Sequence, residues 1–497
     1  MQKISVKTIY LILVISIGLV GLGVGSTFAM FTASSKIDNP ISFTAGIFGE
    51  SDVIETVEVT VPAGETKATN LHVTNSTNSN LNYVMWYIDE GLDIELGSKR
   101  TDSGTYQTTI DAGEEHKYEV SIRNNSSSSV TVVIGVSSGT GSVTLSSDMK
   151  MVPQSELKLK PTLASVITNL YNNSTKTAVP NNSITYQYDT TNNLMKDTAG
   201  NIRYYGASPN NYVYFNCDSY PSTNCELWRI IGVFDGKIKL IRNKTIGLYS
   251  WDNKNKSTGA ETAYGKNDWT TARLMKLLNP STYYTTDAND NGKGQSLYWN
   301  ATSGACYSGQ NNATISCNFT STGIKNDTTR NMIAETTWNL GGWDTSEIFS
   351  NEMYEKERGT TTVSNSSDGI TRATTWTGKI ALPYPSDYGF ATDLSKCSQT
   401  LFNYDSSTDS YACRSNDWMY SIITNSGRKY GWLLTPDSGN AYYAFHVNLA
   451  GYVNYYNYFS YYVYDASGVA PVLYLGSDQD IVAGDGLQSN PYQLANS

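Results

Sequence analysis

The chain has 497 residues, more than one hydrophobic core usually serves, so two or three domains are expected. Charged residues make up only 16% of the sequence, whereas Gly, Ser, Thr, Asn and Tyr are abundant, which favours strands and polar turns over long surface helices. Because the formal net charge is -10 and Lys and Arg are not clustered, no nucleic-acid partner is expected.

The N-terminus is expected to direct export. Lys3 and Lys7 precede a long uncharged stretch with the apolar run "IYLILVISIGLVGLGVG", a pattern typical of a signal peptide, residues 1–30, cut near Ala29. If the segment stays uncut, residues 8–30 are just long enough to anchor the chain in the cytoplasmic membrane. In both cases the rest of the chain is expected to be extracellular, either secreted or held at the cell surface.

Strand patterns dominate the chain up to residue 150. Apolar and polar residues alternate in "VEVTVPAGETKATNLHVTN", "LNYVMWYI" and "HKYEVSIRNNSSSSVTVVIGV", as in half-buried antiparallel strands. We therefore expect a β-sandwich over residues 31–150. A polar linker, residues 151–183, is expected next, and "TLASVITNLY" within it has the apolar spacing of a short helix.

Residues 184–497 are expected to form a second, mainly β domain with some α. "LWRIIGVFDGKIKLIRN" predicts two strands, 227–233 and 237–242, joined by a tight Asp-Gly turn. Three closing strands are expected in "YGWLLTP", "YAFHVNLAGYVNYY" and "GVAPVLYL". Between them, "DANDNG" matches the first half of a calcium-binding loop, but its last ligand position holds Tyr298 and not Glu, so a simple Asn-Gly turn is preferred.

Cysteine usage agrees with export. All six cysteines follow residue 210 in three couples that are adjacent in the sequence, and an even count in an exported chain indicates disulfides. Many pairings are open to six cysteines, so adjacent pairing is a preference. The preferred pairs are Cys217 with Cys225, Cys306 with Cys317 and Cys397 with Cys413. No metal site is expected, because no C-x-x-C motif occurs and the three histidines lie far apart.

The stretch "AMFTASSKIDNPISFTAGIFG", residues 29–49, resembles the start of the TasA and camelysin group of exported Gram-positive proteins. In that group a dedicated signal peptidase cuts ahead of an aromatic residue, and a strand of the form F-x-A/T-G follows. The matching positions here are Phe31, Phe43, Ala45 and Gly46. The resemblance implies export from a Gram-positive cell, and it raises the alternative function of a structural matrix or fibre subunit.

Six stretches of the second domain occur in the order seen in uncharacterised surface proteins of gut Firmicutes. They are "LWRIIGVFDGKIKLIRN", "WTTARLMKLLN", "TGKIALPYPSDYGFA", "NDWMY", "GVAPVLYL" and "GDGLQSNPYQL". Those proteins resemble the C-type-lectin-like group, which includes formylglycine-generating-enzyme modules and phage tropism determinants. The resemblance implies a C-type-lectin-like α+β domain over residues 184–497 that binds a ligand.

Catalysis is not expected. The generating-enzyme modules depend on reactive cysteines, whereas the cysteines here stand in couples explained as structural bridges. No nucleophile, base or metal constellation stands out in the sequence either, so the chain is interpreted as neither an enzyme nor a cofactor-binding protein. An enzyme of the formylglycine-generating-enzyme-like group is kept as the weakest alternative.

A Tyr-rich stretch near the C-terminus, residues 440–464, is the candidate ligand surface. A hairpin about Ala450 and Gly451 would have an apolar face for the core and a polar face with more tyrosine and asparagine than a core wants, because each buried phenol needs a hydrogen-bond partner. Tyrosine and asparagine are typical of binding surfaces. The predicted ligand-binding residues are Tyr442, His446, Asn448, Tyr452, Asn454, Tyr455, Tyr456, Asn457, Tyr458, Tyr461 and Tyr462.

The same stretch contains no Lys, Glu, Gln, Met or Trp, the five types that codons of the form NNY cannot encode. The resemblance to tropism determinants implies a variable region diversified by a retroelement, and chance is the other explanation. The expected partner is an unidentified protein or glycan ligand at the cell surface.

Overall fold

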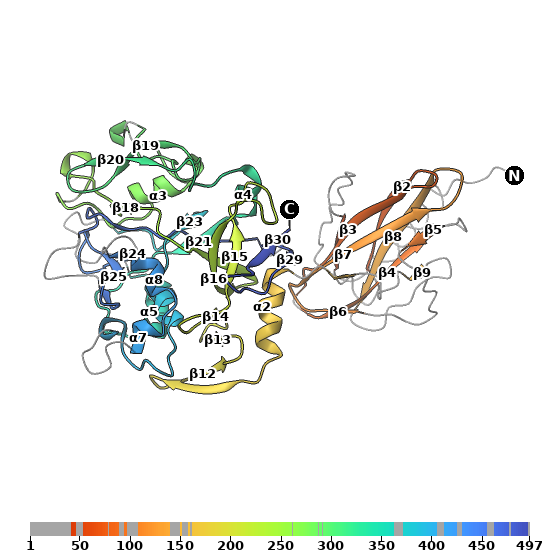
Figure 1. Cartoon of the computed structure of the whole chain (residues 1–497), viewed down its shortest axis with the longest axis horizontal. Coiled ribbons are helices and arrows are strands. Elements are labelled where there is room, and N and C mark those ends of the chain that lie inside the picture. The colour runs from red at the N-terminus through yellow and green to blue at the C-terminus, as the bar shows by residue number, and fades with distance from the viewer. Residues whose placement is uncertain are drawn as a thin grey trace, which may run out of the picture. The chain divides into compact units, whose positions relative to one another are not determined.

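The computed structural model divides the chain into two compact units, Met1–Lys160 and Pro161–Ser497. It describes residues 41–45, 53–77, 79–88, 94–96, 108–139, 150–151, 158–159, 162–260, 262–286, 288–290, 292–361, 371–404, 412–424, 430–454, 462–476 and 479–495. Both units are built mainly of strands (Figure 1), as predicted. The expected signal segment, residues 1–30, lies outside the described residues. Within them, no helix has the length and apolar composition needed to cross a membrane.

The first unit contains two five-stranded sheets that share one hydrophobic cluster. The first sheet has the order β1 (Ile41–Ala45), β3 (Thr66–Asn75), β7 (Glu115–Asn124), β10 (Lys158–Leu159), with β5 (Ile94–Leu96) also on β7. The second has the order β2 (Val53–Val61), β8 (Val130–Gly139), β4 (Leu81–Ile88), β6 (Thr108–Ile110), with β9 (Lys150–Met151) also on β4. Val73 and Ile122 of the first sheet pack with Val61, Leu81 and Val132 of the second.

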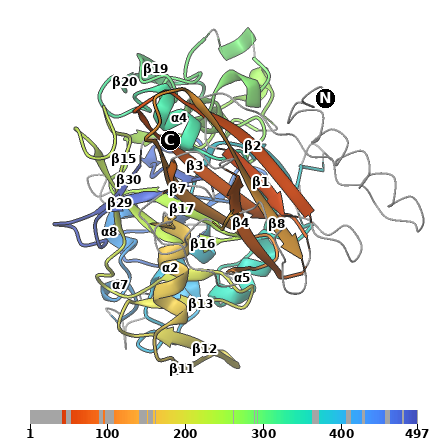
Figure 2. The same cartoon turned by 90° about the vertical axis from the view of Figure 1, so that its right-hand side faces the viewer.

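The same strand and turn pattern occurs twice in the first unit, with an offset of 49 residues (75 to 124). Residues 59–88 and 108–137 both contain the turn sequence Ala-Gly-Glu, and in both an asparagine ends the strand after it. The pairing registers match as well, because β2 pairs with β8 as β6 pairs with β4. Figure 2 shows β2, β4 and β8 of this set. Residues 59–88 and 108–137 are therefore an internal duplication whose halves are related by an approximate two-fold axis.

The asparagine side chain of each half donates hydrogen bonds to the turn of the other half. Asn75 donates from Nδ2 to the Ile110 carbonyl at 3.1 Å, and Asn124 donates to the equivalent Val61 carbonyl at 2.9 Å. Each also donates to the next carbonyl along the turn, and each Oδ1 accepts two hydrogen bonds from the loop that follows it. Both asparagines are fully buried, so equivalent buried hydrogen bonds connect the two halves.

Trp86 and Gly135 are equivalent positions that face each other across β4 and β8, at the approximate axis. The indole of Trp86 occupies the space beside Gly135, where a Cβ atom would lie 2.3 Å from Cζ2 of the ring. Gly135→Val is therefore expected to destabilise the first unit by about 1–3 kcal/mol, the usual cost of overpacking. Denaturant unfolding measures this loss, with Thr131→Val on the exposed side of β8 as control. An unchanged midpoint for Gly135→Val would show that the indole does not cover residue 135.

The second unit contains one large sheet, one smaller sheet and two hairpins. The large sheet has the order β11 (Thr177–Asn181), β12 (Ile184–Asp189), β13 (Leu194–Lys196), β14 (Ile202–Tyr204), β16 (Glu226–Phe234), β15 (Tyr212–Phe215), β30 (Tyr492–Leu494), β29 (Ile481–Ala483). A branch of the same sheet starts at β16, which also pairs with β17 (Lys237–Arg242). In this branch β17 pairs with β28 (Val472–Tyr474), and β28 pairs with β23 (Ile380–Ala381). The smaller sheet has the order β18 (Leu248–Tyr249), β27 (Ser467–Gly468), β24 (Gly431–Pro436), β25 (Ala444–Val447), β26 (Val453–Asn454). The hairpins are β19 (Ser303–Tyr307) with β20 (Thr314–Asn318) and β21 (Thr336–Asn339) with β22 (Thr375–Gly378).

Short helices connect these strands. They are α3 (Arg273–Leu278), α4 (Asp327–Met332), α5 (Ser350–Glu357), α6 (Pro385–Ala391), α7 (Ala412–Ser415) and α8 (Tyr420–Thr424). The helix predicted in "TLASVITNLY" is present as α2 (Leu163–Asn172). It was expected in a linker over residues 151–183, but Leu163 and Ile167 are fully buried in the core of the second unit, which begins at Pro161.

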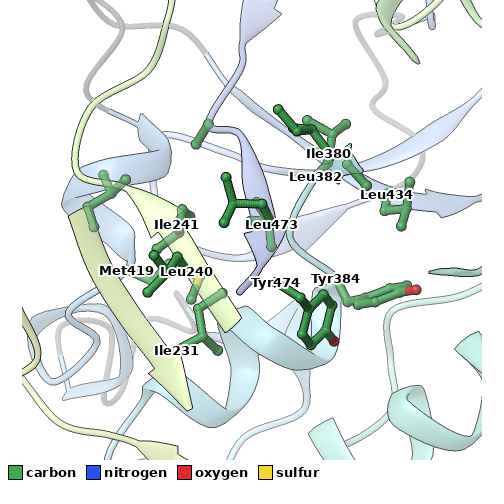
Figure 3. Packing of buried hydrophobic residues seen from close by; sticks show 14 of the residues in the cluster. Ile231, Leu240, Ile241, Ile380, Leu382, Tyr384, Met419, Leu434, Leu473 and Tyr474 are labelled. Atoms are coloured by element: carbon green, nitrogen blue, oxygen red, sulfur yellow. The ribbon is translucent and has the colours of Figure 1, made fainter. Parts of the chain in front are cut away.

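The core of the second unit includes strands from both halves of that unit's sequence. The predicted strands 227–233 and 237–242 are confirmed as parts of β16 and β17, and β17 pairs in turn with β28 near the C-terminus. Figure 3 shows Leu240 of β17 beside Leu473 of β28, with Ile380, Leu382 and Leu434 in the same cluster.

All three adjacent cysteine couples form disulfides in the second unit. They are Cys217–Cys225, Cys306–Cys317 and Cys397–Cys413. Each closes a short loop, as the spacing predicted, and each restricts the unfolded chain.

Candidate functional site

The hairpin predicted around Ala450 and Gly451 is present. β25 and β26 pair antiparallel, with His446 opposite Asn454. Asn448 closes the turn, because its Oδ1 accepts from the backbone N–H groups of Ala450 and Gly451 at 2.9 Å each. Gly451 has a φ of 101°, which a residue with a side chain rarely adopts.

Both faces of β25 are buried, which corrects the expectation that one face meets solvent. His446 is 0% exposed, and Asn448 and Asn454 are each 5% exposed. His446 lies in the interior because β25 is covered on both sides, so its alternating pattern does not separate core from surface. Asn448 of the turn and Asn454 of β26 are buried as well. A ligand at the surface does not reach their side chains in this structure.

The ring of His446 lies between two aromatic side chains. It stacks on Tyr430 with a centroid distance of 5.2 Å, and it meets Trp432 edge-on at 6.0 Å. Burial lowers the pKa of His446 to about 4, because a charged imidazolium loses its hydration there.

This burial predicts a pH effect on stability. Between pH 6.5 and pH 4 the unfolded chain takes up a proton at His446 and the folded chain does not, so acid favours unfolding. His446→Phe keeps the shape of the ring and removes the titration. Between pH 7 and pH 4 the native protein is expected to lose about 3 kcal/mol relative to this variant. Denaturant melts of both proteins at several pH values measure the difference. A difference that does not change with pH would show that His446 titrates normally.

Five tyrosines form a stacked cluster, which we call the tyrosine stack: Tyr264, Tyr442, Tyr443, Tyr462 and Tyr464. The ring of Tyr462 lies at its centre, 4.3 Å from Tyr264, 5.1 Å from Tyr464 and 5.3 Å from Tyr443, with interplanar angles of 11°, 19° and 14°. Tyr442 tilts against Tyr264 and Tyr462. Tyr264 is 36% exposed. Tyr442, Tyr462 and Tyr464 are half-buried, so the stack reaches the surface.

Close backbone contacts fix the loop that carries Tyr264. Gly265 has a φ of 85°, and a Cβ atom there would lie 2.4 Å from the Asp252 carbonyl, so the loop passes closely over the chain beneath it. Two residues further on, Asn267 holds the segment before β25. Its Nδ2 lies 2.8–2.9 Å from the carbonyl oxygens of Asp437, Asn440 and Tyr443.

The segment that carries Tyr462 and Tyr464 is held by Val463 between them. Val463 is fully buried. Its N–H donates to the Tyr442 carbonyl at 3.0 Å, and its carbonyl accepts from the Asp252 N–H at 3.0 Å. Three chain segments thus form the tyrosine stack, and hydrogen bonds to their backbone groups hold them in place.

The structure brings together only some of the residues predicted for the surface. Tyr442 and Tyr462 belong to the tyrosine stack, and Tyr452 is half-buried against Phe402, with ring centroids 5.6 Å apart. The remaining candidates lie outside the described residues and stay predictions: Tyr455, Tyr456, Asn457, Tyr458 and Tyr461. Sequence reasoning missed Tyr264, because its contact with Tyr462 arises only in the folded chain.

Two buried carboxylates of the second unit are each paired with two cations. Asp387 accepts from Arg203 Nη1 at 3.0 Å and from Lys239 Nζ at 2.5 Å, and these cations hold the pKa of the buried carboxyl below its usual value despite its burial. Asp290, within the "DANDNG" stretch, pairs with Arg273 at 3.0 Å and Lys276 at 2.8 Å. Asp290 is not a ligand position of the calcium-loop pattern, and Asp287 and Asn291 lie outside the described residues, so the turn interpretation stays a prediction.

Comparison with known protein families, characterised proteins and solved structures finds no significant match to this chain. Among the described residues, no three or more His, Cys, Asp and Glu side chains gather as metal ligands. The tyrosine stack is the feature from which a function can be argued.

Proposed function

We propose that this chain is an exported cell-surface protein that recognises a ligand through its Tyr-rich C-terminal surface. The tyrosine stack carries this proposal. Rings packed in a core are covered on all sides, whereas Tyr264 exposes 36% of its surface and three further rings are half-buried beside it. Tyrosines fixed at a surface supply rigid contact area and a polar hydroxyl at low entropic cost, which suits binding.

Export is supported by two independent features. The N-terminal sequence has the charge and apolar pattern of a signal peptide. The three disulfides suggest an oxidising environment outside the cytoplasm. Within this proposal the first unit is a β-sandwich, since its two sheets share one core, and the second unit is a C-type-lectin-like domain.

The test uses the full-length gene secreted by a Gram-positive host. The secreted protein is applied to one array of immobilised glycans and one array of cell-surface proteins and peptides. The native protein is expected to bind a member of at least one array. Tyr264→Ala should weaken that binding by about tenfold or more, as for a residue at the centre of a contact. Val482→Ala is the control, because Val482 is 58% exposed on β29, away from the stack in sequence.

A structural matrix or fibre subunit is the second candidate. It is favoured by the resemblance of residues 29–49 to the TasA group and by the position of β1 at an edge of its sheet. Electron microscopy of the purified protein distinguishes the two proposals: filaments formed by the native protein and by Tyr264→Ala alike would favour the structural role.

A further inference from the structure

We propose that the exposed end of the tyrosine stack binds a neutral carbohydrate, with a pyranose ring packed on the face of Tyr264. This inference rests on the proposed function and adds the class of ligand and the residue at its centre. One face of Tyr264 is covered by Tyr462 at 4.3 Å, and 36% of the residue remains exposed. The ring of Tyr264 also meets Tyr442 at 5.5 Å and Tyr464 at 6.1 Å. The remaining exposed part of this ring is where a sugar ring would pack.

Sugar rings match such a surface chemically. A pyranose presents C–H groups on a face and hydroxyl groups around its edge. The C–H groups pack on the negatively polarised face of an aromatic ring, while the hydroxyls meet polar groups beside it. Tyr442, Tyr462 and Tyr464 are half-buried phenols next to Tyr264. Burial, with the Asp465 charge as a second cause, raises the pKa of Tyr464 to about 12, so its hydroxyl stays a hydrogen-bond donor.

The charges around the stack favour an uncharged ligand. Lys266, two residues after Tyr264, already lies 3.7 Å from the Asp268 carboxylate. The Asp465 carboxylate accepts from the Tyr462 N–H at 2.7 Å. With a formal net charge of -10 for the whole chain, an anionic ligand would be repelled at long range. Neutral glycans avoid this cost.

The size of the surface also favours a sugar over a folded protein partner. A stable protein interface buries about 800 Å² on each side. A tyrosine side chain has roughly 250 Å² at most to offer, and Tyr264, the most exposed member of the stack, exposes 36% of its surface. The exposed part of Tyr264 alone is thus well below the area of a protein interface, but it is large enough for one sugar ring.

Because hydrogen bonds hold the tyrosine stack in place before binding, even a weak stacking interaction can contribute to affinity. Asn267 and Val463 hold the three segments through backbone carbonyl and N–H groups at 2.8–3.0 Å. A surface that is ordered before binding loses little conformational entropy when the ligand arrives. Stacking on a prearranged ring can therefore contribute to affinity almost in full.

The experiment measures binding of soluble neutral oligosaccharides to the secreted full-length protein by calorimetry, with probes made of glucose, galactose, mannose or N-acetylglucosamine units. At least one is expected to bind. Tyr264→Ala should reduce its affinity by about tenfold or more, whereas Tyr264→Phe, which keeps the ring face, should stay within about threefold. Binding should change little between low and high salt, because no ion pair is involved. It should also persist with a chelator present. Circular dichroism and Val482→Ala control for folding.

The outcomes separate this inference from the proposed function. If a protein or a charged glycan binds and depends on Tyr264, while no neutral sugar does, the proposed function holds and the carbohydrate inference is overturned. Neutral-sugar binding that Tyr264→Ala leaves unchanged would place the site elsewhere and overturn it as well. If nothing on either array or among the soluble sugars binds, both proposals fall.

Discussion

Replacing Asp387 with asparagine is expected to lower the unfolding free energy of the second unit by about 3–5 kcal/mol, the usual cost of breaking a buried ion pair. Asp387 is fully buried and accepts from both Arg203 and Lys239, at 3.0 Å and 2.5 Å. Asparagine fills the same space but carries no charge. Arg203 would then keep only its pair with the Asp197 carboxylate at 2.6 Å, and Lys239 would lose its ion pair with residue 387.

The pH dependence of this loss follows from Lys239. Burial lowers the pKa of Lys239 to about 8 although Asp387 opposes the shift. Without Asp387 the pKa of Lys239 is lower still, so Lys239 of the variant can lose its charge at mildly alkaline pH. The destabilisation by Asp387→Asn is therefore expected to be smaller at pH 9 than at pH 7.

Denaturant unfolding followed by tryptophan fluorescence measures both effects. Asp327→Asn is the matched control, because the Asp327 carboxylate is 90% exposed in its ion pair with Arg330 and exposed pairs contribute little. If the two variants lose the same small amount of stability, the carboxylate of Asp387 is in contact with water and the buried network is not as described.

Local sequence patterns predicted the features that neighbouring residues determine. The Asp-Gly turn between β16 and β17, helix α2 and the three short disulfide loops all depend on residues close together in the chain. The alternation of apolar and polar residues gave a wrong prediction of exposure at β25, because a strand covered on both faces buries every side chain. His446 was therefore assigned to a surface on which it does not lie.

Contacts between distant residues could not be read in the same way. Arg203 and Asp387 are 184 residues apart, and Tyr264 meets Tyr462 only because the loop and the C-terminal segment converge in the fold. The duplication in the first unit is different, since its signal was present in the sequence. The turn Ala-Gly-Glu recurs at residues 63–65 and 112–114, each followed at the same distance by a buried asparagine.

That duplication leads to the second large expected effect. Asn75→Ala and Asn124→Ala are each expected to destabilise the first unit by about 3 kcal/mol, because each removes several buried hydrogen bonds and leaves carbonyl groups of the other half unsatisfied. The two losses should be similar, since Asn75 and Asn124 make equivalent bonds. Alanine in place of either would free the turn of the opposite half.

Denaturant unfolding of the two variants tests the equivalence. Asn125→Ala is the control, because Asn125 is exposed and directly follows the second buried asparagine; surface changes of this kind usually stay within about 0.5 kcal/mol. A double variant should lose less than the sum of the two single losses, because both changes weaken the same contact between the halves. Two unequal losses, or strict additivity in the double variant, would mean that the halves fold independently and that the repeated sequence is not a two-fold interface.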